Sequence, residues 1–497
     1  MTLHDLKYWE QLATRLDIPT GAFIDGAYVT AEDGATFTAR NPATGEVLAD
    51  VAACGTQDID RAVAAARRSF NSGCWSRLSP RERKTTLLRF AGLIEQHAEE
   101  LALLQTLEMG KPIADSLSFD LAETARCVAW YAEAIDKHYD EIAPTADNVH
   151  ATLTHEALGV VAAVTPWNFP LMISAWKFAP ALAVGNSVVL KPAEQSSLSA
   201  LRLAALASEA GLPDGVFNVT PGLGAVAGQA LGLHMDVDCI AFTGSTATGK
   251  RFMRYSGDSN LKRVWLECGG KSPHIVFDDC KDLEAAARAA AAGIFTNQGE
   301  VCIAGSRLYV QDSIYDEFMP LLTAAAANMQ PGNPLDPATR MGAMVDASQY
   351  QRVQDYITLA RKEGMKLLTG ESSASPVAGG WFLPPTILEG QHDQTLMREE
   401  VFGPVLGVTR FTSEQEVIAM ANDSVYGLGA GLWTRDLGRA HRVSKLLRAG
   451  LVWVNCYADG DISVPFGGVK QSGFGRDKSL HALSKYADLK TTWMNLD

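Results

Sequence analysis

A chain of 497 residues is long enough for two to four globular domains, and a composition of 47% hydrophobic and 20% charged residues gives no sign of extended disorder. The net charge of −14 argues against nucleic acid as the main partner, because binding to phosphates needs a basic face. It also disfavours tight binding to anionic membranes.

The N-terminal segment and the cysteines indicate the compartment. The segment MTLHDLKYWEQLATRLDIP lacks the basic and then apolar pattern of a secretory signal. The eight cysteines form no Cys-x-x-Cys pair, so neither a zinc ribbon nor a thioredoxin-like site is predicted, and we expect no metal. We therefore expect a cytoplasmic protein with reduced thiols.

Apolar runs and helical stretches alternate along the chain. Helices are predicted within 59–70, 83–110 and 196–211, and buried strands within 187–192, 239–245, 274–279 and 450–456. Short, continuous β-branched runs are typical of parallel strands that are covered on both faces. The alternation predicts doubly wound α/β domains.

The stretch from 157 to 176 carries no charge and is long enough to suggest a membrane span. Pro166, Asn168 and Pro170 interrupt its middle, and lipid would leave the polar groups there unsatisfied. We therefore interpret the stretch as a buried strand that breaks into a polar turn.

Two glycine-rich turns are candidates for cofactor contact. Residues 221–228 (PGLGAVAG) have a Gly-x-Gly-x-x-x-Gly spacing, one residue off the dinucleotide fingerprint, so an ordinary strand-to-helix turn is the alternative. Residues 244–250 (GSTATGK) nearly match a P-loop, but Arg251 stands where a hydroxyl should hold magnesium. Because this turn follows a buried strand, it still offers helix N–H groups to a pyrophosphate.

Cys302 follows a predicted turn. The alanine-rich helix within 282–300 is ended by Asn297, Gln298 and Gly299, which favours exposure of the cysteine to a cleft, whereas an inert buried thiol is the ordinary alternative. Further along, residues 480–495 run from a helix into an alternating strand, an edge that is available for assembly.

Three polar residues beside turns are candidates for catalysis. Glu267 ends the strand-like RVWLE, and Glu400 lies in REEVFGP; each by itself is more often a solvated acid than a catalyst. Asn168 is an amide within an apolar run, and it is either satisfied by its own turn or an oxyanion donor.

Together these segments resemble the aldehyde dehydrogenase superfamily from about Phe23 to the C-terminus, and their number and order make the resemblance specific. The matching motifs are PWNFP (166–170), LKPAE (190–194), FTGST (242–246), LECGGKSP (266–273), NQGEVCIAG (297–305), EEVFGPV (399–405) and PFGGVKQSGFGRD (465–477).

The resemblance implies that Cys302 is the nucleophile, that Glu267 is the general base, and that Asn168 with the backbone N–H of Cys302 forms the oxyanion hole. It implies NAD as the cofactor, with NADP also accepted, because a carboxylate at Glu194 repels a 2′-phosphate. The expected cofactor contacts are Lys191 and Glu194 at the adenosine ribose, Ser245 and Trp167 near the pyrophosphate, Gly244 at the nicotinamide end, and Glu400 and Phe402 at the nicotinamide ribose.

The family architecture implies two doubly wound Rossmann-like domains and a small β arm. The NAD(P)-binding domain is expected to span 1–138 and 158–265, the catalytic domain 266–477, and the oligomerisation arm 139–157 and 478–497. We expect a homodimer or homotetramer that binds an aldehyde and neither nucleic acid nor membrane.

Residues 456–462 (CYADGDI) precede the PFGG motif, at a place where many family members that oxidise hydrophobic aldehydes carry an aromatic residue. Asp459 and Asp461 there favour a cationic substrate tail, with a solvated loop as the alternative. Aromatic walls are expected from Phe169, Trp176, Tyr457 and Phe466, with Trp130 and Tyr131 as further candidates.

The segments 130–137 and 459–483 are similar to bacterial γ-glutamyl-γ-aminobutyraldehyde and 4-guanidinobutyraldehyde dehydrogenases of putrescine breakdown. The resemblance therefore implies oxidation of such an aldehyde, or of 4-aminobutyraldehyde, in polyamine or arginine catabolism. Betaine aldehyde or broad aliphatic aldehyde oxidation is the alternative. A structural protein that keeps this fold without catalysis is a further alternative, which the intact set of Cys302, Glu267 and Asn168 argues against.

Overall fold

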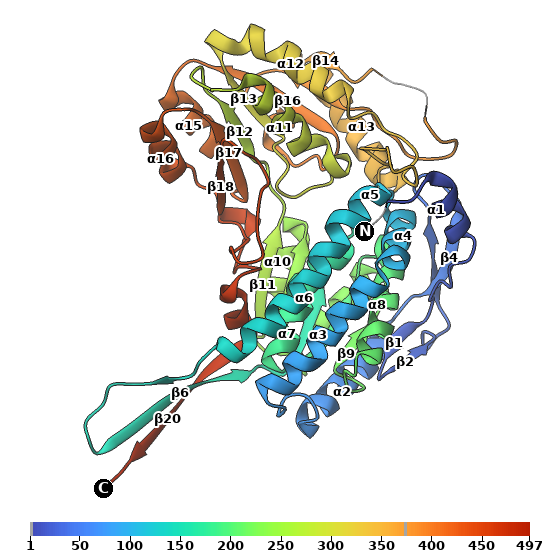
Figure 1. Cartoon of the computed structure of the whole chain (residues 1–497), viewed down its shortest axis with the longest axis vertical. Coiled ribbons are helices and arrows are strands. Elements are labelled where there is room, and N and C mark those ends of the chain that lie inside the picture. Colours follow the sequence, from blue (N-terminus) through green and yellow to red (C-terminus); the bar gives the residue numbers. More distant parts are fainter. Residues whose placement is uncertain (1–2, 372–374) are drawn as a thin grey trace.

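The computed structural model describes residues 3–371 and 375–497. The sheet of the lower lobe in Figure 1 has five parallel strands among these residues, namely β7 (Val160–Val164), β8 (Ser187–Lys191), β9 (Phe217–Val219), β10 (Cys239–Gly244) and β11 (Arg263–Cys268). Antiparallel strands at its edges are β1 (Ala22–Ile24), β2 (Ala27–Val29) and β19 (Gly473–Phe474). The strand order is β19-β11-β10-β7-β8-β9-β1-β2.

Helices cover both faces of this sheet, because successive strand residues point to opposite faces. Val160 and Ala162 of β7 join one core, whereas Val161 and Ala163 join the other. The first core is completed by α2 (Thr56–Ser72), α9 (Gln229–Leu233) and α10 (Thr246–Gly257). The second is completed by α3 (Pro80–Gln96), α4 (Ala98–Met109), α6 (Ala122–Ala134), α7 (Pro170–Val184) and α8 (Leu198–Glu209).

The single helix expected within 83–110 is wrong, because α3 and α4 are separate helices that meet at His97. The backbone of His97 leaves the helical region (φ −101°, ψ 20°), and its ring contacts Glu100 and Arg202. These contacts override the helix propensity of the continuous sequence. A short α5 (Ile113–Asp115) and a π-helical turn over Ser116–Leu121 then lead into α6.

The upper lobe holds the second sheet, which is parallel except at β14 (Figure 1). Its strands are β12 (Pro273–Val276), β13 (Arg307–Gln311), β14 (Lys366–Thr369), β15 (Thr386–Glu389), β16 (Val405–Phe411), β17 (Gly429–Trp433) and β18 (Leu451–Val454). Their order is β14-β15-β16-β13-β12-β17-β18. The helices packed on it are α11 (Leu283–Phe295), α12 (Tyr315–Ala327), α13 (Ala347–Lys362), α14 (Thr395–Arg398), α15 (Glu414–Asn422) and α16 (Leu437–Leu446).

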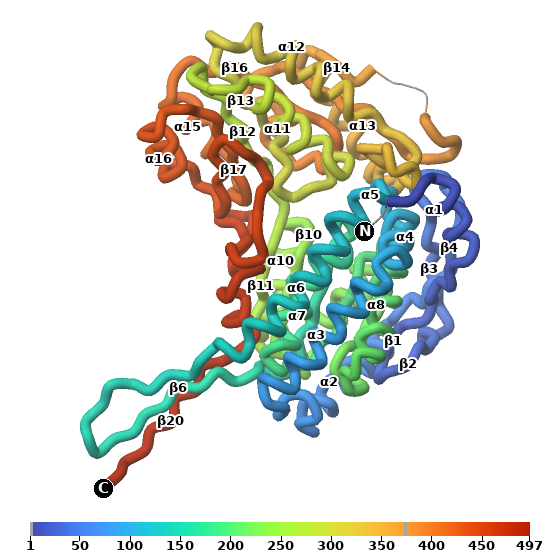
Figure 2. Tube along the Cα trace, in the orientation of Figure 1, coloured from blue at the N-terminus to red at the C-terminus, as the bar shows by residue number. Residues whose placement is uncertain are grey.

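A ribbon of strands projects from the lower lobe, with the C-terminus at its tip (Figure 2). It is built from β5 (Glu141–Ile142), β6 (Val149–Ala157) and β20 (Ala487–Asn495), all antiparallel. A 3₁₀ turn over Leu480–Lys485 precedes β20, where the sequence predicts a helix. Near the N-terminus, α1 (Leu6–Ala13) is followed by a hairpin of β3 (Thr36–Arg40) and β4 (Val47–Ala52).

The uncharged stretch from 157 to 176 is a buried strand that breaks into a turn, as the sequence predicts. It forms β7, then a turn over 165–169, and then the first residues of α7. Within 3–371 and 375–497, no helix is both long enough and apolar enough to cross a membrane. The predicted buried parallel strands are also confirmed as β8, β10 and β12. The strand predicted within 450–456 is parallel as β18, but it is a half-buried edge strand.

Candidate active site

The order of the first sheet reverses between β7 and β10, which are neighbours although β8 and β9 separate them in sequence. Ligands of open α/β sheets bind at the carboxyl ends of the strands beside such a reversal. Trp167 follows β7 and Ser245 follows β10, so both lie at this edge.

Ser245 begins α10, and its hydroxyl accepts a hydrogen bond of 3.3 Å from the N–H of Thr248. The first N–H groups of a helix have no partner within the helix, which suits an anionic pyrophosphate. Gly244 precedes this turn, and a Cβ there would lie 2.6 Å from the ring of Phe242. The strand end therefore requires glycine.

Lys191 and Glu194 form a pair after β8. The ammonium of Lys191 is buried, donates to the carbonyl of Pro192 at 2.9 Å and lies 3.5 Å from Glu194. Burial lowers the pKa of Lys191, whereas the Glu194 carboxylate raises it. The Glu194 side chain stays 38% exposed, so its carboxylate is accessible to the hydroxyls of a ribose.

Glu400 lies against the glycine turn that follows β11. The N–H of Gly270 donates to its carboxylate at 2.9 Å, and a Cβ on Gly269 would collide with the same carboxylate. Burial raises the pKa of Glu400 to about 7, although the Gly270 N–H and Lys271 act to lower it. The two glycines therefore allow this acid to approach the backbone.

Phe402 has a left-handed backbone with φ of 60°, and its ring meets that of Trp167 edge to face, with centroids 5.3 Å apart. Two residues of α13 that sequence reasoning missed hold this loop. The Gln349 amide donates to the Phe402 carbonyl at 2.7 Å, and Arg352 donates to the Glu400 carbonyl at 3.1 Å. A signal for them was absent, because α13 is distant in sequence from every recognised motif.

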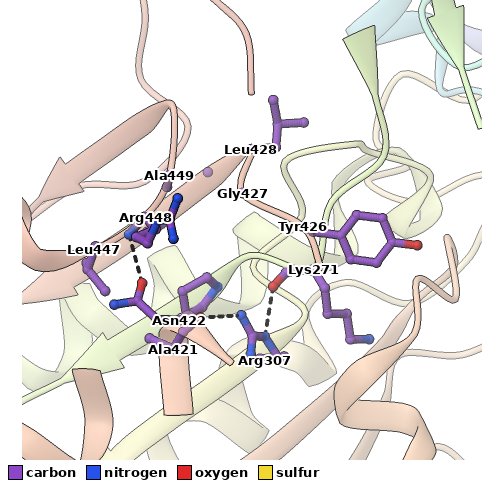
Figure 3. A pocket seen from close by; sticks show the side chains of 13 residues that line it. Lys271, Arg307, Ala421, Asn422, Tyr426, Gly427, Leu428, Leu447, Arg448 and Ala449 are labelled. Atoms are coloured by element: carbon purple, nitrogen blue, oxygen red, sulfur yellow. Dashed lines mark hydrogen bonds between the residues drawn. The ribbon is translucent and has the colours of Figure 1, made fainter. Parts of the chain in front are cut away.

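Arg307 anchors the turn that carries Lys271. Its guanidinium donates to the carbonyl of Lys271 at 2.8 Å and to that of Ala421 at 2.9 Å (Figure 3). The hollow beside these residues has a volume of about 10 Å³, room for about one water molecule, so it is no substrate site.

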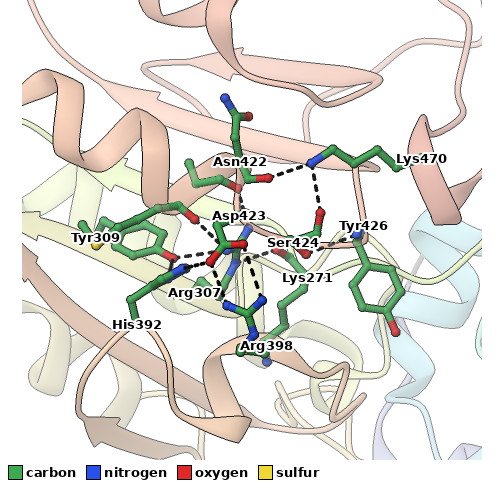
Figure 4. Close-up of polar contacts among 12 residues, drawn as sticks. Lys271, Arg307, Tyr309, His392, Arg398, Asn422, Asp423, Ser424, Tyr426 and Lys470 are labelled. Carbon is green, nitrogen blue, oxygen red and sulfur yellow. Dashed lines mark hydrogen bonds and ion pairs between the residues drawn. The ribbon is translucent and has the colours of Figure 1, made fainter.

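A hydrogen-bonded chain extends this anchor (Figure 4). Arg307 donates to the Tyr309 hydroxyl at 3.2 Å, His392 lies 3.0 Å from that hydroxyl, and Asp423 joins His392 to Arg398, the residue just before the loop of Glu400. The network therefore holds the turn that carries Lys271 on one side of the Glu400 contact and Arg398, just before the Glu400 loop, on the other.

The loop that carries Cys302 leaves α11 through the turn that the sequence predicts, and the backbone of this turn is left-handed. Asn297 and Gln298 have φ of 51° and 57°. The Tyr457 hydroxyl donates to the carbonyl of Ile303 at 2.7 Å, which ties the loop to the segment after β18. Cys302 is half-buried and lines a cavity.

The Cys302 thiol is protonated in this environment. Burial raises its pKa well above the ordinary range, and the neighbouring carboxyls of Glu267 and Glu400 raise it further. Because the thiolate is the nucleophilic form of cysteine, attack by Cys302 requires a base that takes its proton.

Asn168 is buried next to this loop. Its Nδ2 donates to the carbonyl oxygen of Glu300 at 2.8 Å, and Asn297 donates to the Asn168 carbonyl at 3.1 Å. An amide nitrogen carries two hydrogens, so Asn168 keeps a second donor. The N–H of Cys302 forms no hydrogen bond among the described residues.

Glu267 is the penultimate residue of β11 and is buried, with its Oε1 unpartnered within the described part of the chain. Burial and the carboxylate of Asp477 raise its pKa to about 8, against the opposing effect of Lys177 and Lys485. Asp477 is held between those two ammonium groups. A carboxyl with a pKa near neutrality is suited to general base catalysis.

The cavity at Cys302 has a volume of about 380 Å³ and opens between α7, the segment 111–123 and the loop after β18. Its wall includes Phe169, Trp176, Tyr457, Asp459 and Phe466, as expected from the sequence. The rings of Trp176 and Phe466 lie 5.0 Å apart.

Three of the expected substrate residues lie elsewhere. Asp461 is not part of the cavity wall and forms an ion pair with Arg126. Trp130 and Tyr131 also lie outside the wall; Tyr131 is fully buried, and its hydroxyl donates to the Ser479 carbonyl at 3.2 Å. Both aromatics belong to α6, and neither lines the cavity.

Sequence reasoning missed several charged residues of the wall. They are Lys111, Asp115, Asp120, Glu123 and Lys478. Asp120 is paired with Lys111, whose ammonium lies 3.8 Å from the ring centroid of Phe169. Burial raises the pKa of Asp115 to about 6. The π-helical turn around Ser116–Leu121, a local irregularity often found at functional sites, has no simple sequence signal.

The model of the aldehyde dehydrogenase family matches residues 28–492. The chain belongs to this family. A relative from Escherichia coli K12, the NADP/NAD-dependent aldehyde dehydrogenase PuuC, is 55% identical over 100% of both chains. The predictions of an aldehyde dehydrogenase fold and of an enzyme of this family are therefore confirmed.

Solved structures of relatives share the architecture of this aldehyde dehydrogenase. The γ-glutamyl-γ-aminobutyraldehyde dehydrogenase of Burkholderia cenocepacia J2315 has 55% identity and a TM-score of 0.97, with 99% of this chain and 100% of that chain covered. The indole-3-acetaldehyde dehydrogenase AldA of P. syringae, in complex with NAD+, has 53% identity and a TM-score of 0.97 over the same shares.

The residues of this dehydrogenase suit a dinucleotide. The helix N-terminus at Ser245 matches a pyrophosphate, and the exposed carboxylate of Glu194 matches ribose hydroxyls. Leu223 and Val226 of the 221–228 turn expose 47% and 45% of their surface, which is apolar area that an adenine ring can cover. Among the described residues, no group of three or more His, Cys, Asp or Glu side chains is placed to hold a metal ion.

Proposed function

We propose that this aldehyde dehydrogenase oxidises an amino- or guanidinoaldehyde to the carboxylic acid with NAD(P), through a thioester on Cys302. The observation that carries the proposal is the cavity at Cys302, whose wall bears the carboxylates of Asp115, Glu123 and Asp459 among aromatic rings. Carboxylates attract a nitrogen-bearing tail, and aromatic faces accommodate its methylene groups and any positive charge.

The first step is attack of the Cys302 sulfur on the aldehyde carbon, which forms a thiohemiacetal. The thiol proton of Cys302 is lost to solvent in this step. Glu267 acts on the water of the later hydrolysis, since its pKa of about 8 leaves part of it ionised at neutral pH. The second hydrogen of the Asn168 amide and the N–H of Cys302 donate to the developing oxyanion, and each such donor contributes about 3 kcal/mol in comparable sites.

Bound NAD(P) supplies the acceptor for the hydride that leaves the aldehyde carbon. Glu400 and Phe402 hold its nicotinamide half, and Lys191, Glu194 and Ser245 its adenosine and pyrophosphate half. Glu267 then removes a proton from water, the hydroxide adds to the thioester carbon, and the Cys302 sulfur leaves with a proton. The products are the carboxylic acid, the reduced cofactor and a proton.

The cofactor preference follows from Glu194. An exposed carboxylate beside the ribose repels a 2′-phosphate, so NAD is favoured. Lys191 lies 3.5 Å from Glu194 and balances part of its charge, which leaves room for NADP as a second cofactor.

The substrate class is supported by the relatives named for γ-glutamyl-γ-aminobutyraldehyde. The aromatic wall at Trp176 and Phe466 favours the alternative of a broad range of aldehydes, as does the indole-3-acetaldehyde dehydrogenase among the relatives. A panel of 4-aminobutyraldehyde, 4-guanidinobutyraldehyde, betaine aldehyde and hexanal, followed by absorbance of the reduced cofactor, tests this. Higher kcat/KM for 4-aminobutyraldehyde and 4-guanidinobutyraldehyde than for betaine aldehyde and hexanal supports the proposal, whereas equal or higher values for betaine aldehyde or hexanal refute it.

We further propose that 1–138 and 158–265 form the cofactor domain, 266–477 the catalytic domain, and 139–157 with 478–497 an arm for a homodimer or homotetramer. The arm carries the exposed side chains of Leu489 and Trp493, and β18 is the edge strand of the second sheet. Sedimentation of the intact chain against that of a variant truncated after Lys485 tests the assembly. A cytoplasmic location stays a prediction from the sequence.

A further inference from the structure

Lys478 is a cation in the wall of the substrate cavity that lacks a partner of opposite charge. Its ammonium lies 5.7 Å from the ring centroid of Trp176, and a Cβ on Gly460 would be 3.5 Å from its Nζ. Of the residues that the structure describes, none forms a hydrogen bond or ion pair with this Nζ.

The neighbouring cations differ from Lys478 in this respect. Lys111 is paired with Asp120, and both Lys177 and Lys485 are paired with Asp477. Arg126 is paired with Asp461 and lies 3.3 Å from Glu123. Arg126 therefore partly neutralises Glu123 of the cavity wall and Asp461 outside it, and the charge of Lys478 is left for a ligand.

The backbone holds Lys478 in place. Phe466 and Asp477 exchange hydrogen bonds of 2.8 and 2.7 Å, and the Ser479 N–H donates to the carbonyl of Ile462 at 2.7 Å. Lys478 itself has a left-handed φ of 60°. These bonds on both sides of the residue fix the direction of its side chain and reduce the entropy that a ligand would have to overcome.

The residue is also largely covered, with 9% of its surface exposed. Burial lowers the pKa of Lys478, whereas Glu123 and Asp461 raise it. Its Nζ is not among the sealed polar atoms of the described residues, so the ammonium is accessible to a ligand in the cavity.

We propose that Lys478 binds a carboxylate at the end of the substrate that is remote from the aldehyde. Asp459, which is exposed and lines the cavity beside Gly460, faces the ammonium of the same head group. The substrate class is then an aldehyde with an amino acid at its far end, such as a γ-glutamyl amide. This inference rests on the proposed function and narrows it from cationic tails to zwitterionic ones.

A purely cationic tail fits this wall less well. An ammonium or guanidinium placed beside Lys478 is repelled by it, and the repulsion is strong where water is excluded. An uncharged tail leaves the Lys478 ammonium without a partner of opposite charge. A carboxylate at the far end of the substrate is attracted by Lys478 and gives its ammonium a partner of opposite charge.

The test measures kcat/KM of the purified enzyme for matched aldehydes before and after Lys478→Met. Hexanal and 6-oxohexanoate have equal chain length and differ by the carboxylate, as 4-aminobutyraldehyde and its γ-glutamyl amide differ by the amino acid head. We expect Lys478→Met to lower kcat/KM about 10- to 100-fold for 6-oxohexanoate and for the γ-glutamyl amide, mainly through KM. Hexanal should change less than about threefold, and 4-aminobutyraldehyde should be unchanged or improved.

Lys478→Arg keeps the charge and should retain most of the activity on the carboxylate-bearing aldehydes, and Lys445→Met on the exposed side of α16 is the control. Equal losses on all four aldehydes, or no loss on 6-oxohexanoate, overturn the inference. Failure of the proposed function would be recognised by a different result. The unmodified enzyme would then have a higher kcat/KM for hexanal than for both nitrogen-bearing aldehydes.

Discussion

The amide of Asn168 and the carbonyl oxygen of Glu300 are joined by a hydrogen bond of 2.8 Å that links the turn after β7 to the loop of Cys302. This bond orients Asn168 and leaves its second N–H as a donor beside the nucleophile. The proposed oxyanion hole thus combines residues from the two lobes of the protein.

Replacement Asn168→Ala should therefore lower kcat about 10²- to 10³-fold, because one preorganised donor to the oxyanion is lost. The dissociation constant for NAD, measured by fluorescence titration, should change little. A drop in kcat below tenfold would remove Asn168 from the oxyanion hole.

Glu267→Gln should stop hydrolysis of the thioester, because an amide cannot accept a proton from water. The acylated enzyme should accumulate, and mass spectrometry of the quenched reaction should find the added mass on Cys302. An unacylated Cys302 in a variant that is slow would mean that Glu267 acts before the thioester forms.

The pH profile of kcat carries the same information. Burial raises the pKa of Glu267 to about 8, and the base is active as the carboxylate, so kcat should rise with pH and level off above about 8. The rising limb should disappear in Glu267→Gln. A wild-type profile that falls over this range would contradict the assignment.

The raised pKa of Glu267 also predicts a stability effect. The folded state favours the neutral carboxyl of Glu267, whereas this carboxyl ionises near pH 4.5 in the unfolded chain. The contribution of Glu267 to the free energy of unfolding should therefore decrease as pH rises from about 4.5 to about 8 and stay constant above that. Glu267→Gln removes the titrating group, so its stability relative to wild type should increase over that interval. Urea denaturation at several pH values measures the difference, and a constant difference would contradict the burial of this acid.

Gly269→Ala should weaken cofactor binding, because the added Cβ collides with the carboxylate of Glu400. We expect KM for NAD to rise about 5- to 100-fold, since the cost of overpacking is about 1–3 kcal/mol. Gly257→Ala is the matched control, because a Cβ there meets nothing within 4 Å. Equal KM values for NAD in the two variants would show that Glu400 can move without weakening cofactor binding.

Local patterns were enough to predict some of this site. The left-handed turn at Asn297 and Gln298 is marked by the residues that end the alanine-rich helix, and the buried strands are marked by their β-branched runs. These features depend on interactions between residues close in sequence, so the chain itself contains the signal.

Other parts of the site depend on contacts between distant segments. Arg126 and Asp461 are 335 residues apart in the sequence and form an ion pair. The loop sequence predicts that Asp461 binds the substrate, but Asp461 binds Arg126 instead. Lys478 follows the last family motif and has no pattern of its own, yet the fold places it in the cavity wall. Sequence reasoning found the charge of this loop but could not find which charges neutralise one another.

The nucleophile is the central claim, and Cys302→Ala tests it most directly. With Cys456→Ala, which alters a cysteine outside the cavity wall, as the control, we predict that Cys302→Ala abolishes reduction of NAD by every aldehyde of the panel while the dissociation constant for NAD stays within about twofold. Turnover by Cys302→Ala at a rate comparable to that of the Cys456→Ala control would contradict the account.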